Sequence, residues 1–282
     1  MKPWLRWTLI GFVGVALLVG FAAYGYLDGW HIDRVPSAEL SAKLRPHDVV
    51  MRPEGDGPFP AVILMHGCSG IYENNHTWAK LYVEQGYAAF IVNSLAPRGL
   101  AERELDNGVC DGSVLWGSER AGDLLATLGY VRALPFVDPD QIVLAGWSHG
   151  GWTIMDAFAL AAEDKVPTSL SDDAGGLDGV VAAILIYPYC GAFSVTYQTG
   201  DWDDAPPTLM LLAENDTMIS TPDCLEVAEG LEADGQRLTT YVYPGVDHAF
   251  DYSDLPPDSR FSFHPDVTAD AQDRVVAFLK EN

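Results

Sequence analysis

Residues 141–162 read QIVLAGWSHGGWTIMDAFALAA, and this segment indicates how the rest of the chain is organised. A short apolar run leads into Gly146-Trp147-Ser148-His149-Gly150, and apolar residues at helical spacing follow. A G-x-S-x-G sequence between a strand and a helix is typical of a nucleophile elbow, a sharp turn that exposes the serine hydroxyl. Ser148 is therefore our candidate nucleophile; the alternative is a serine that caps an ordinary helix in a glycine-rich turn.

The same alternation of apolar runs and helical segments continues on both sides of this segment. Continuous apolar runs are typical of strands buried on both faces of a parallel sheet. We expect strands at 60–66, 87–93, 141–147, 180–187, 208–213 and 238–243, with an antiparallel edge strand at 48–52 as an option. Helices are expected at 77–85, 119–133, 150–162, 222–233 and 267–280, and loops or lids at 97–117, 163–179 and 251–265. This order predicts an α/β fold: a mostly parallel central sheet with helices on both faces.

A serine nucleophile needs a base within hydrogen-bond reach, and the base needs a carboxylate that orients it. His248 lies in PGVDHAF just after the run at 238–243, and Asp216 lies in AENDTM just after the run at 208–213. Both positions fall at the carboxyl edge of the sheet, where an elbow serine also lies. Glu214 is a rival carboxylate, but its place at the strand end turns it to the opposite face. We therefore predict the triad Ser148, Asp216 and His248, in the chain order of an α/β-hydrolase.

Acyl transfer also needs two hydrogen-bond donors for the oxyanion of the tetrahedral intermediate. The backbone N–H of His149, directly after the nucleophile, is the first candidate. The second is the backbone N–H of Cys68, because the run ending in HGCSG at 66–70 has glycines that let the backbone approach a substrate. An ordinary glycine turn is the alternative for HGCSG.

Composition limits the classes of partner. The chain has 282 residues, of which 40 are Asp or Glu and 16 are Lys or Arg, so its formal net charge is −24. Such a surface repels phosphate backbones, and we expect no nucleic-acid partner. We found no HExxH, no CxxC and no nucleotide-binding glycine motif after a strand, so no metal and no cofactor are expected.

The N-terminal segment differs from the rest of the chain. Residues 7–27 carry no charge and would span roughly 31 Å as a helix, which is enough to cross the hydrocarbon core. Lys2 and Arg6 precede this run and two aspartates follow it, so the positive-inside rule exports the C-terminal part. We predict one transmembrane helix in a signal-anchor segment, 1–34, and a catalytic domain, 35–282, outside the cytoplasm. A cleaved signal peptide, which would release a secreted enzyme, is the alternative.

Six short motifs occur together in the chain: HGCSG (66–70), NSLAPRG (93–99), GWSHGG (146–151), YPYCG (187–191), END (214–216) with Pro222 and Cys224 after it, and YPGVDHAF (243–250). In this combination the chain resembles the dienelactone hydrolase family of α/β-hydrolases, over about residues 45–282. The resemblance implies cofactor-free hydrolysis of an ester or lactone by a nucleophile–Asp–His triad. It departs from the naming members at position 148, where they have a cysteine nucleophile, so their lactone substrate is not carried over.

Two disulfides are expected, because export places the four cysteines in an oxidising compartment. Cys68 and Cys110 follow two strands that are neighbours in an α/β-hydrolase sheet, and Cys190 and Cys224 follow another neighbouring pair. We therefore predict the pairs Cys68–Cys110 and Cys190–Cys224. Four buried free thiols are the alternative.

The sequence thus predicts a serine hydrolase that cleaves small carboxylic esters or lactones, held at a membrane through residues 7–27. Two other functions stay open. One is a serine peptidase of the prolyl-peptidase type, which has the same triad order but usually carries a large extra domain. The other is a tethered binding module that has kept the fold without activity.

Overall fold

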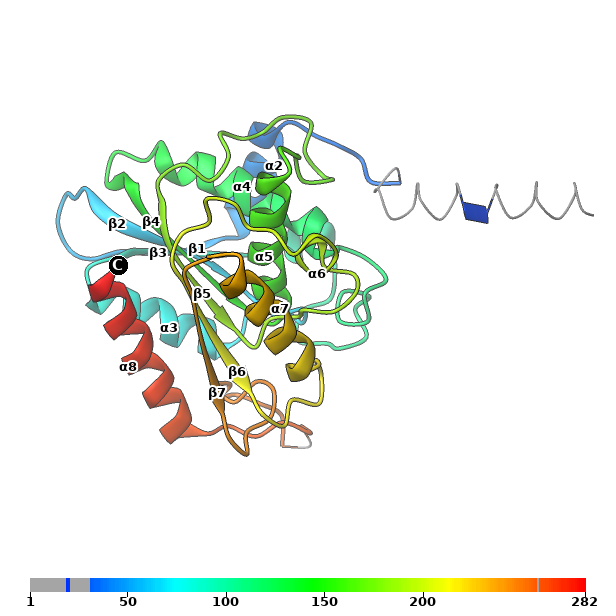
Figure 1. The fold of residues 1–282 in the computed structure, drawn as a ribbon. Coiled ribbons are helices and arrows are strands. Elements are labelled where there is room, and N and C mark those ends of the chain that lie inside the picture. Colours follow the sequence, from blue (N-terminus) through cyan, green and yellow to red (C-terminus); the bar gives the residue numbers. More distant parts are fainter. Residues whose placement is uncertain (1–18, 21–30, 258) are drawn as a thin grey trace, which may run out of the picture.

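The computed structural model describes residues 19–20, 31–257 and 259–282 (Figure 1). Within these residues the chain forms a seven-stranded sheet in the order β1-β3-β2-β4-β5-β6-β7. All neighbouring strands are parallel except β1 and β3, which are antiparallel. The strands are β1 (Val49–Met51), β2 (Phe59–Met65), β3 (Ala88–Val92), β4 (Val137–Trp147), β5 (Val180–Ile186), β6 (Thr208–Ala213) and β7 (Leu238–Tyr243). The predicted α/β fold with a mostly parallel sheet and an antiparallel edge strand is confirmed.

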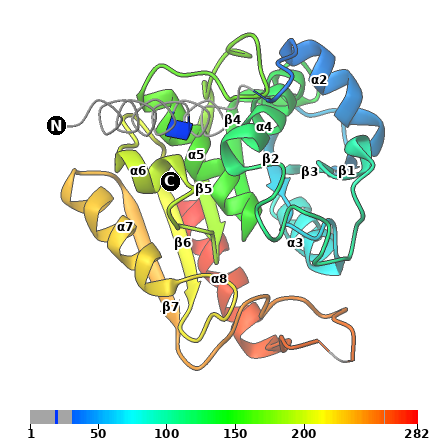
Figure 2. The same ribbon diagram turned by 90° about the vertical axis from the view of Figure 1, so that its right-hand side faces the viewer.

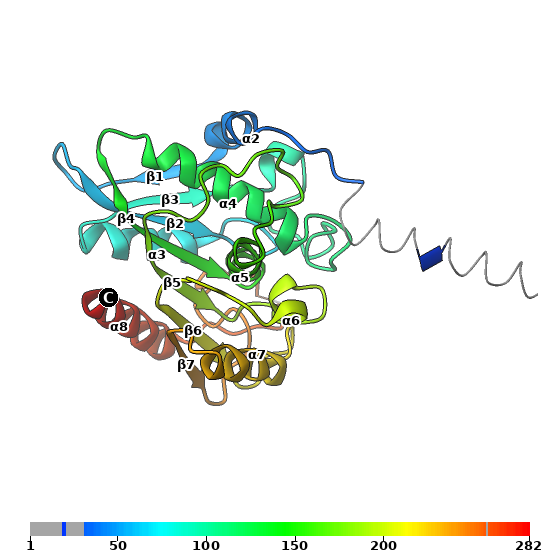
Figure 3. The ribbon, with the colours of Figure 1, turned by 45° about the horizontal axis from the view of Figure 1, so that its top comes forward.

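Helices cover both faces of the sheet (Figure 3). One face is covered by α4 (Gly117–Arg132), α5 (His149–Ala162) and α7 (Thr221–Ala233), and α2 (Ser37–Leu44) packs against α4. The other face is covered by α3 (Glu73–Glu84) and α8 (Pro265–Glu281). Figure 2 shows β7 and α7 at one end of the sheet and β1 and α2 at the other.

The strands are apolar along their whole length because both of their faces are buried. In β2, Ala61, Ile63 and Met65 belong to the core under α4 and α5, whereas Val62 and Leu64 belong to the core under α3 and α8. All five side chains have no exposed surface. Alternate residues of one strand therefore fill two separate cores, which is why the run lacks the alternating polar pattern of a half-exposed strand.

Three details differ from the expected elements. The helix α2 and the short α6 (Val195–Thr199) were not predicted, since eight and five residues are too few for a clear apolar period. The strand β4 begins at Val137, because Val137 pairs with Phe59 across an irregular step in the ladder. The predicted loops 97–117 and 251–265 contain no strand; the first includes the 3-10 turn η2 (Ala96–Arg98) and the first residue of α4.

Most of the predicted anchor, 7–27, lies outside the described residues. Among the residues that the structure describes, no helix is both long and apolar enough to cross a bilayer.

Candidate active site

Ser148 occupies a sharp turn between β4 and α5. Its backbone has φ +52°, in the left-handed region that residues other than glycine rarely adopt. A Cβ at Gly146 would lie 2.4 Å from the carbonyl oxygen of Gly150, and a Cβ at Gly150 would lie 1.9 Å from that of Met65. Both glycines of the motif are therefore required by close backbone approach, and the strand–turn–helix geometry is that of a nucleophile elbow.

The three predicted triad residues lie together at the carboxyl edge of the sheet. His248 Nε2 lies 3.0 Å from Ser148 Oγ, and His248 Nδ1 lies 2.6 Å from Asp216 Oδ2. When Nδ1–H donates to this carboxylate, Nε2 is the ring nitrogen that can accept the serine proton. Ser148 is 8% exposed and His248 is 5% exposed, so the reacting atoms are shielded but reachable.

Asp216 is held by its own loop. Its Oδ1 accepts hydrogen bonds from the backbone N–H groups of Met218 (2.8 Å) and Ile219 (2.9 Å), while Oδ2 faces His248. The rival carboxylate Glu214 lies elsewhere, since its Oε2 accepts from the backbone N–H of Gly245 at 2.7 Å. The choice of Asp216 over Glu214 as the partner of the histidine therefore agrees with the geometry.

Asp247 links the two loops that carry Asp216 and His248, and sequence reasoning missed it. Its Oδ1 accepts from the backbone N–H groups of Thr217 (2.8 Å) and His248 (2.6 Å). One carboxylate therefore fixes the loop of the acid and the loop of the base relative to one another.

The loop proposed to donate to the oxyanion is anchored by buried polar groups. His66 Nδ1 donates to the carbonyl of Gly67 at 2.6 Å, and Nε2 accepts from the backbone N–H of Ser94 at 3.2 Å. Burial and the nearby Arg120 guanidinium hold the pKa of His66 well below its usual range, so this histidine is neutral. Arg120 donates to the His66 carbonyl at 2.8 Å. His66 is thus a structural residue that orients the backbone around Cys68.

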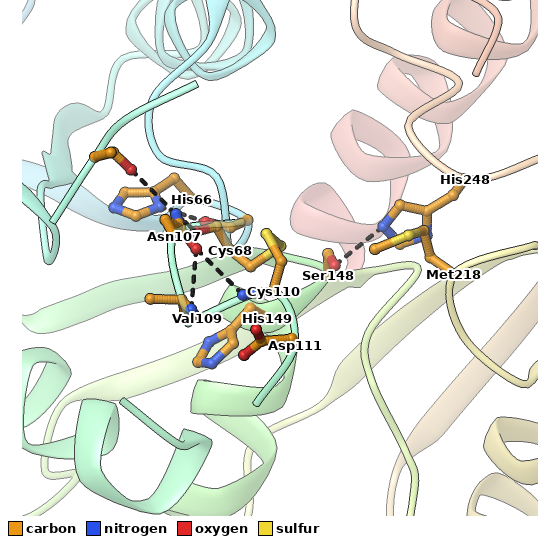
Figure 4. The surroundings of a disulfide bond; sticks show 12 residues. His66, Cys68, Asn107, Val109, Cys110, Asp111, Ser148, His149, Met218 and His248 are labelled. Atoms are coloured by element: carbon orange, nitrogen blue, oxygen red, sulfur yellow. Dashed lines mark hydrogen bonds between the residues drawn. A yellow bond between two sulfur atoms is a disulfide. The ribbon is translucent and has the colours of Figure 1, made fainter. Parts of the chain in front are cut away.

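Both predicted disulfides are present in the structure, Cys68–Cys110 and Cys190–Cys224. Figure 4 shows Ser148 between the Cys68–Cys110 disulfide and His248. Asn107 supports the same loop: its Nδ2 donates to the Cys68 carbonyl at 2.9 Å, and its Oδ1 accepts from Val109 N–H at 2.9 Å. The backbone N–H of His149 is the first of α5, so no carbonyl four residues earlier in that helix can accept it.

A buried carboxylate under the histidine was also missed. Asp251 accepts hydrogen bonds from Trp78 and Trp147 Nε1 (both 2.8 Å), from Asn74 Nδ2 (3.2 Å) and from the hydroxyl of Tyr187. The Tyr187 ring lies 4.5 Å from that of His248, between centroids. Burial raises the pKa of Asp251, and its four donors oppose that shift. No sequence signal identifies this cluster, because its members come from four separate segments.

Ser148 borders two cavities. The larger, of about 390 Å³, is also lined by Tyr72, His248, Tyr252 and residues of the 251–265 loop. The smaller, of about 160 Å³, is also lined by His149, Trp152, Tyr189 and both cysteines of the 68–110 pair. The loops 97–117 and 251–265, which the sequence left without an element, therefore form cavity walls.

In residues 19–20, 31–257 and 259–282, no three His, Cys, Asp or Glu side chains lie together as metal ligands would.

Comparisons with known proteins agree with the fold. The dienelactone hydrolase family model matches residues 47–282. A Synechocystis sp. protein named "Putative carboxymethylenebutenolidase" is 26% identical over 231 residues, which cover 79% of this chain and 86% of that protein. The crystal structure of "Putative Dienelactone Hydrolase" from Klebsiella pneumoniae has a TM-score of 0.62 at 20% identity and covers 83% of this chain and 92% of that one. Thermogutta terrifontis esterase 2, phosphorylated by paraoxon, has a TM-score of 0.62 at 17% identity and covers 83% and 88%.

The sheet, the elbow and the structural neighbours show the α/β-hydrolase fold. The family model spans most of the chain, and the chain belongs to the dienelactone hydrolase family. Membership of this family supports a hydrolase.

Proposed function

We propose that this protein is a serine hydrolase that cleaves carboxylic esters or lactones through an acyl-enzyme. The observation that carries the proposal is the unbroken series of contacts Ser148 Oγ–His248 Nε2–Asp216 Oδ2, at 3.0 and 2.6 Å, at the carboxyl edge of the sheet. This geometry provides a nucleophile, a base that reaches it and a carboxylate that fixes the tautomer of the base.

The reaction proceeds in two balanced steps. Ser148 Oγ forms a bond to the substrate carbonyl carbon while its proton moves to His248 Nε2, and the backbone N–H groups of Cys68 and His149 stabilise the oxyanion. The bond to the leaving oxygen then breaks, and that oxygen takes the proton from Nε2. Water repeats the sequence on the acyl-enzyme, which releases the acid and restores Ser148.

The proposed nucleophile has a direct test. Ser148→Ala is expected to lose about three or more orders of magnitude in turnover of p-nitrophenyl acetate, because triad members act as a unit. Ser171→Ala, an exposed serine that borders neither cavity, is the matched control and should be unchanged. Retention of more than about a tenth of the wild-type rate in Ser148→Ala would end the proposal.

A second measurement separates the remaining functions. The neighbour esterase 2 is phosphorylated by paraoxon, and we expect the same reagent or a fluorophosphonate to add one adduct here, on the Ser148 peptide. Absence of the adduct would favour an inactive binding module. A panel of p-nitrophenyl esters and aminoacyl anilides then distinguishes an esterase from a peptidase by which leaving group is released.

We also propose that residues 7–27 anchor the chain in a membrane with the hydrolase domain outside the cytoplasm. Two disulfides support this location, because disulfides persist in oxidising compartments. Protease added to intact cells or spheroplasts should degrade the domain, and N-terminal sequencing of the mature protein distinguishes an anchor from a cleaved signal peptide. A domain that is digested only after the cells are lysed would contradict this location.

A further inference from the structure

Ser148 lies at the junction of two cavities that differ in size and in the side chains that border them. We propose that the smaller cavity binds the acyl half of the ester and the larger cavity binds the alcohol half, so that the preferred substrates combine a short, uncharged acyl group with a bulkier alcohol. This inference rests on the proposed ester hydrolysis and specifies its substrate class.

The position of the base decides which half of the substrate enters which cavity. The leaving oxygen must receive its proton from His248 Nε2, so the alcohol half has to lie on the side of His248. His248 and its neighbour Ala249 border the larger cavity only. The leaving group is therefore directed into the larger cavity.

The proposed oxyanion donors place the other half. The carbonyl oxygen points to the backbone N–H groups of Cys68 and His149, and the acyl substituent leaves the carbonyl carbon on the side away from the leaving group. His149 borders the smaller cavity only, whereas Cys68 borders both. The acyl chain thus enters the smaller cavity.

The size and walls of this cavity limit the length of the acyl chain. Its volume is about 160 Å³, against about 390 Å³ for the larger cavity. Two of its walls are fixed. One is the Cys68–Cys110 disulfide, and the other is Trp152, whose ring lies 4.8 Å from that of His149 and 4.7 Å from that of Tyr189 between centroids. Phe193 forms the outer wall, is 51% exposed, and packs on Trp116 at 5.1 Å between centroids. Phe193 is therefore an exposed apolar side chain at the border of this cavity.

Charge favours a neutral acyl group. Burial and Arg120 lower the pKa of His149 to about 3, so this ring carries no charge at neutral pH. Asp111 is the ionised side chain among the described residues that border the smaller cavity. Its carboxylate would repel a second carboxylate on the acyl chain.

The test varies the acyl chain and the alcohol separately. With p-nitrophenol as the constant leaving group, Phe193→Ala should raise the octanoate-to-acetate ratio of kcat/KM by roughly tenfold or more. The shorter side chain leaves room for further methylenes of the acyl chain, and each buried methylene favours the longer ester. Phe193→Trp should lower the butyrate-to-acetate ratio. Phe263→Ala is the matched control, because Phe263 is 42% exposed and borders neither cavity, and its ratios should equal those of the wild type.

A second variant tests the opposite cavity. Leu105, which is 49% exposed, borders the larger cavity only. Leu105→Ala should change the relative kcat/KM values of acetate esters of ethanol, hexanol and naphthol while it leaves the acyl-chain ratios unchanged.

The outcomes are distinct. An acyl preference that is unchanged in both Phe193 variants, or a Phe193→Ala effect confined to the alcohol series, would overturn the assignment even though the enzyme is an esterase. A wild-type enzyme that hydrolyses none of these esters would instead refute the proposed function, and the cavity assignment with it.

Discussion

Removal of the Cys68–Cys110 disulfide should affect stability and catalysis together, whereas removal of the Cys190–Cys224 disulfide should affect mainly stability. The two bridges join residues 42 and 34 positions apart. In the chain-entropy model both loops give nearly the same value, about 4 kcal/mol of unfolding free energy each. The pair Cys190→Ala/Cys224→Ala is therefore a matched control for Cys68→Ala/Cys110→Ala.

Catalysis should separate the two double variants. Cys68 carries a proposed oxyanion donor and borders both cavities, whereas Cys190 and Cys224 border neither. Deletion of one oxyanion donor typically costs a hundredfold to a thousandfold in rate. Without the disulfide, Asn107 still holds the Cys68 carbonyl at 2.9 Å, so we expect kcat/KM to fall by roughly tenfold rather than by the full amount.

The assay has two parts. Urea unfolding without reductant should give a loss of about 4 kcal/mol for each double variant. The kcat/KM for p-nitrophenyl acetate, measured where every variant is fully folded, should fall by about tenfold for the Cys68/Cys110 pair and by less than about threefold for the control pair. Equal losses of activity in both variants, or full activity without the Cys68–Cys110 bridge, would refute the reasoning that this disulfide positions the oxyanion loop.

Two further predictions concern buried carboxylates. Tyr187→Phe removes one of four donors to Asp251 but keeps the ring beside His248. It should lower the unfolding free energy by about 1–3 kcal/mol in urea titrations and change kcat/KM by less than about threefold. An unchanged urea midpoint would contradict this prediction. Burial raises the pKa of Asp156 to about 7, so between about pH 4 and 7 its carboxyl group is protonated in the folded state and ionised in the unfolded state. The contribution of this group to the unfolding free energy is therefore complete below about pH 4 and is lost as pH rises through about 7. The unfolding free energy of the wild type minus that of Asp156→Asn should therefore fall by about 1.4 kcal/mol per pH unit between pH 5 and 7, and a constant difference would show that Asp156 does not titrate there.

Local sequence was sufficient to predict the sheet and to propose the triad, because both depend on patterns that are short in the chain. A six-residue apolar run such as 208–213 is typical of a strand that is buried on both faces, and β6 has those bounds. Ser148, Asp216 and His248 each lie in the turn or loop that follows such a strand, and parallel strands bring their carboxyl ends to one edge. The pairing of the cysteines follows from the same order of strands.

Only the tertiary structure determined how the site is supported and divided. Asp251 receives its donors from Asn74, Trp78, Trp147 and Tyr187, which lie up to 177 positions away in the sequence. No local pattern encodes such contacts, since a buried carboxylate is satisfied by whichever donors the packed helices and strands present to it. The two cavities arise likewise from loops without a periodic pattern, 97–117 and 251–265, whose course is set by the surfaces they cover. The sequence by itself determined the reaction centre that we propose, and packing decided the space that remains around it for a substrate.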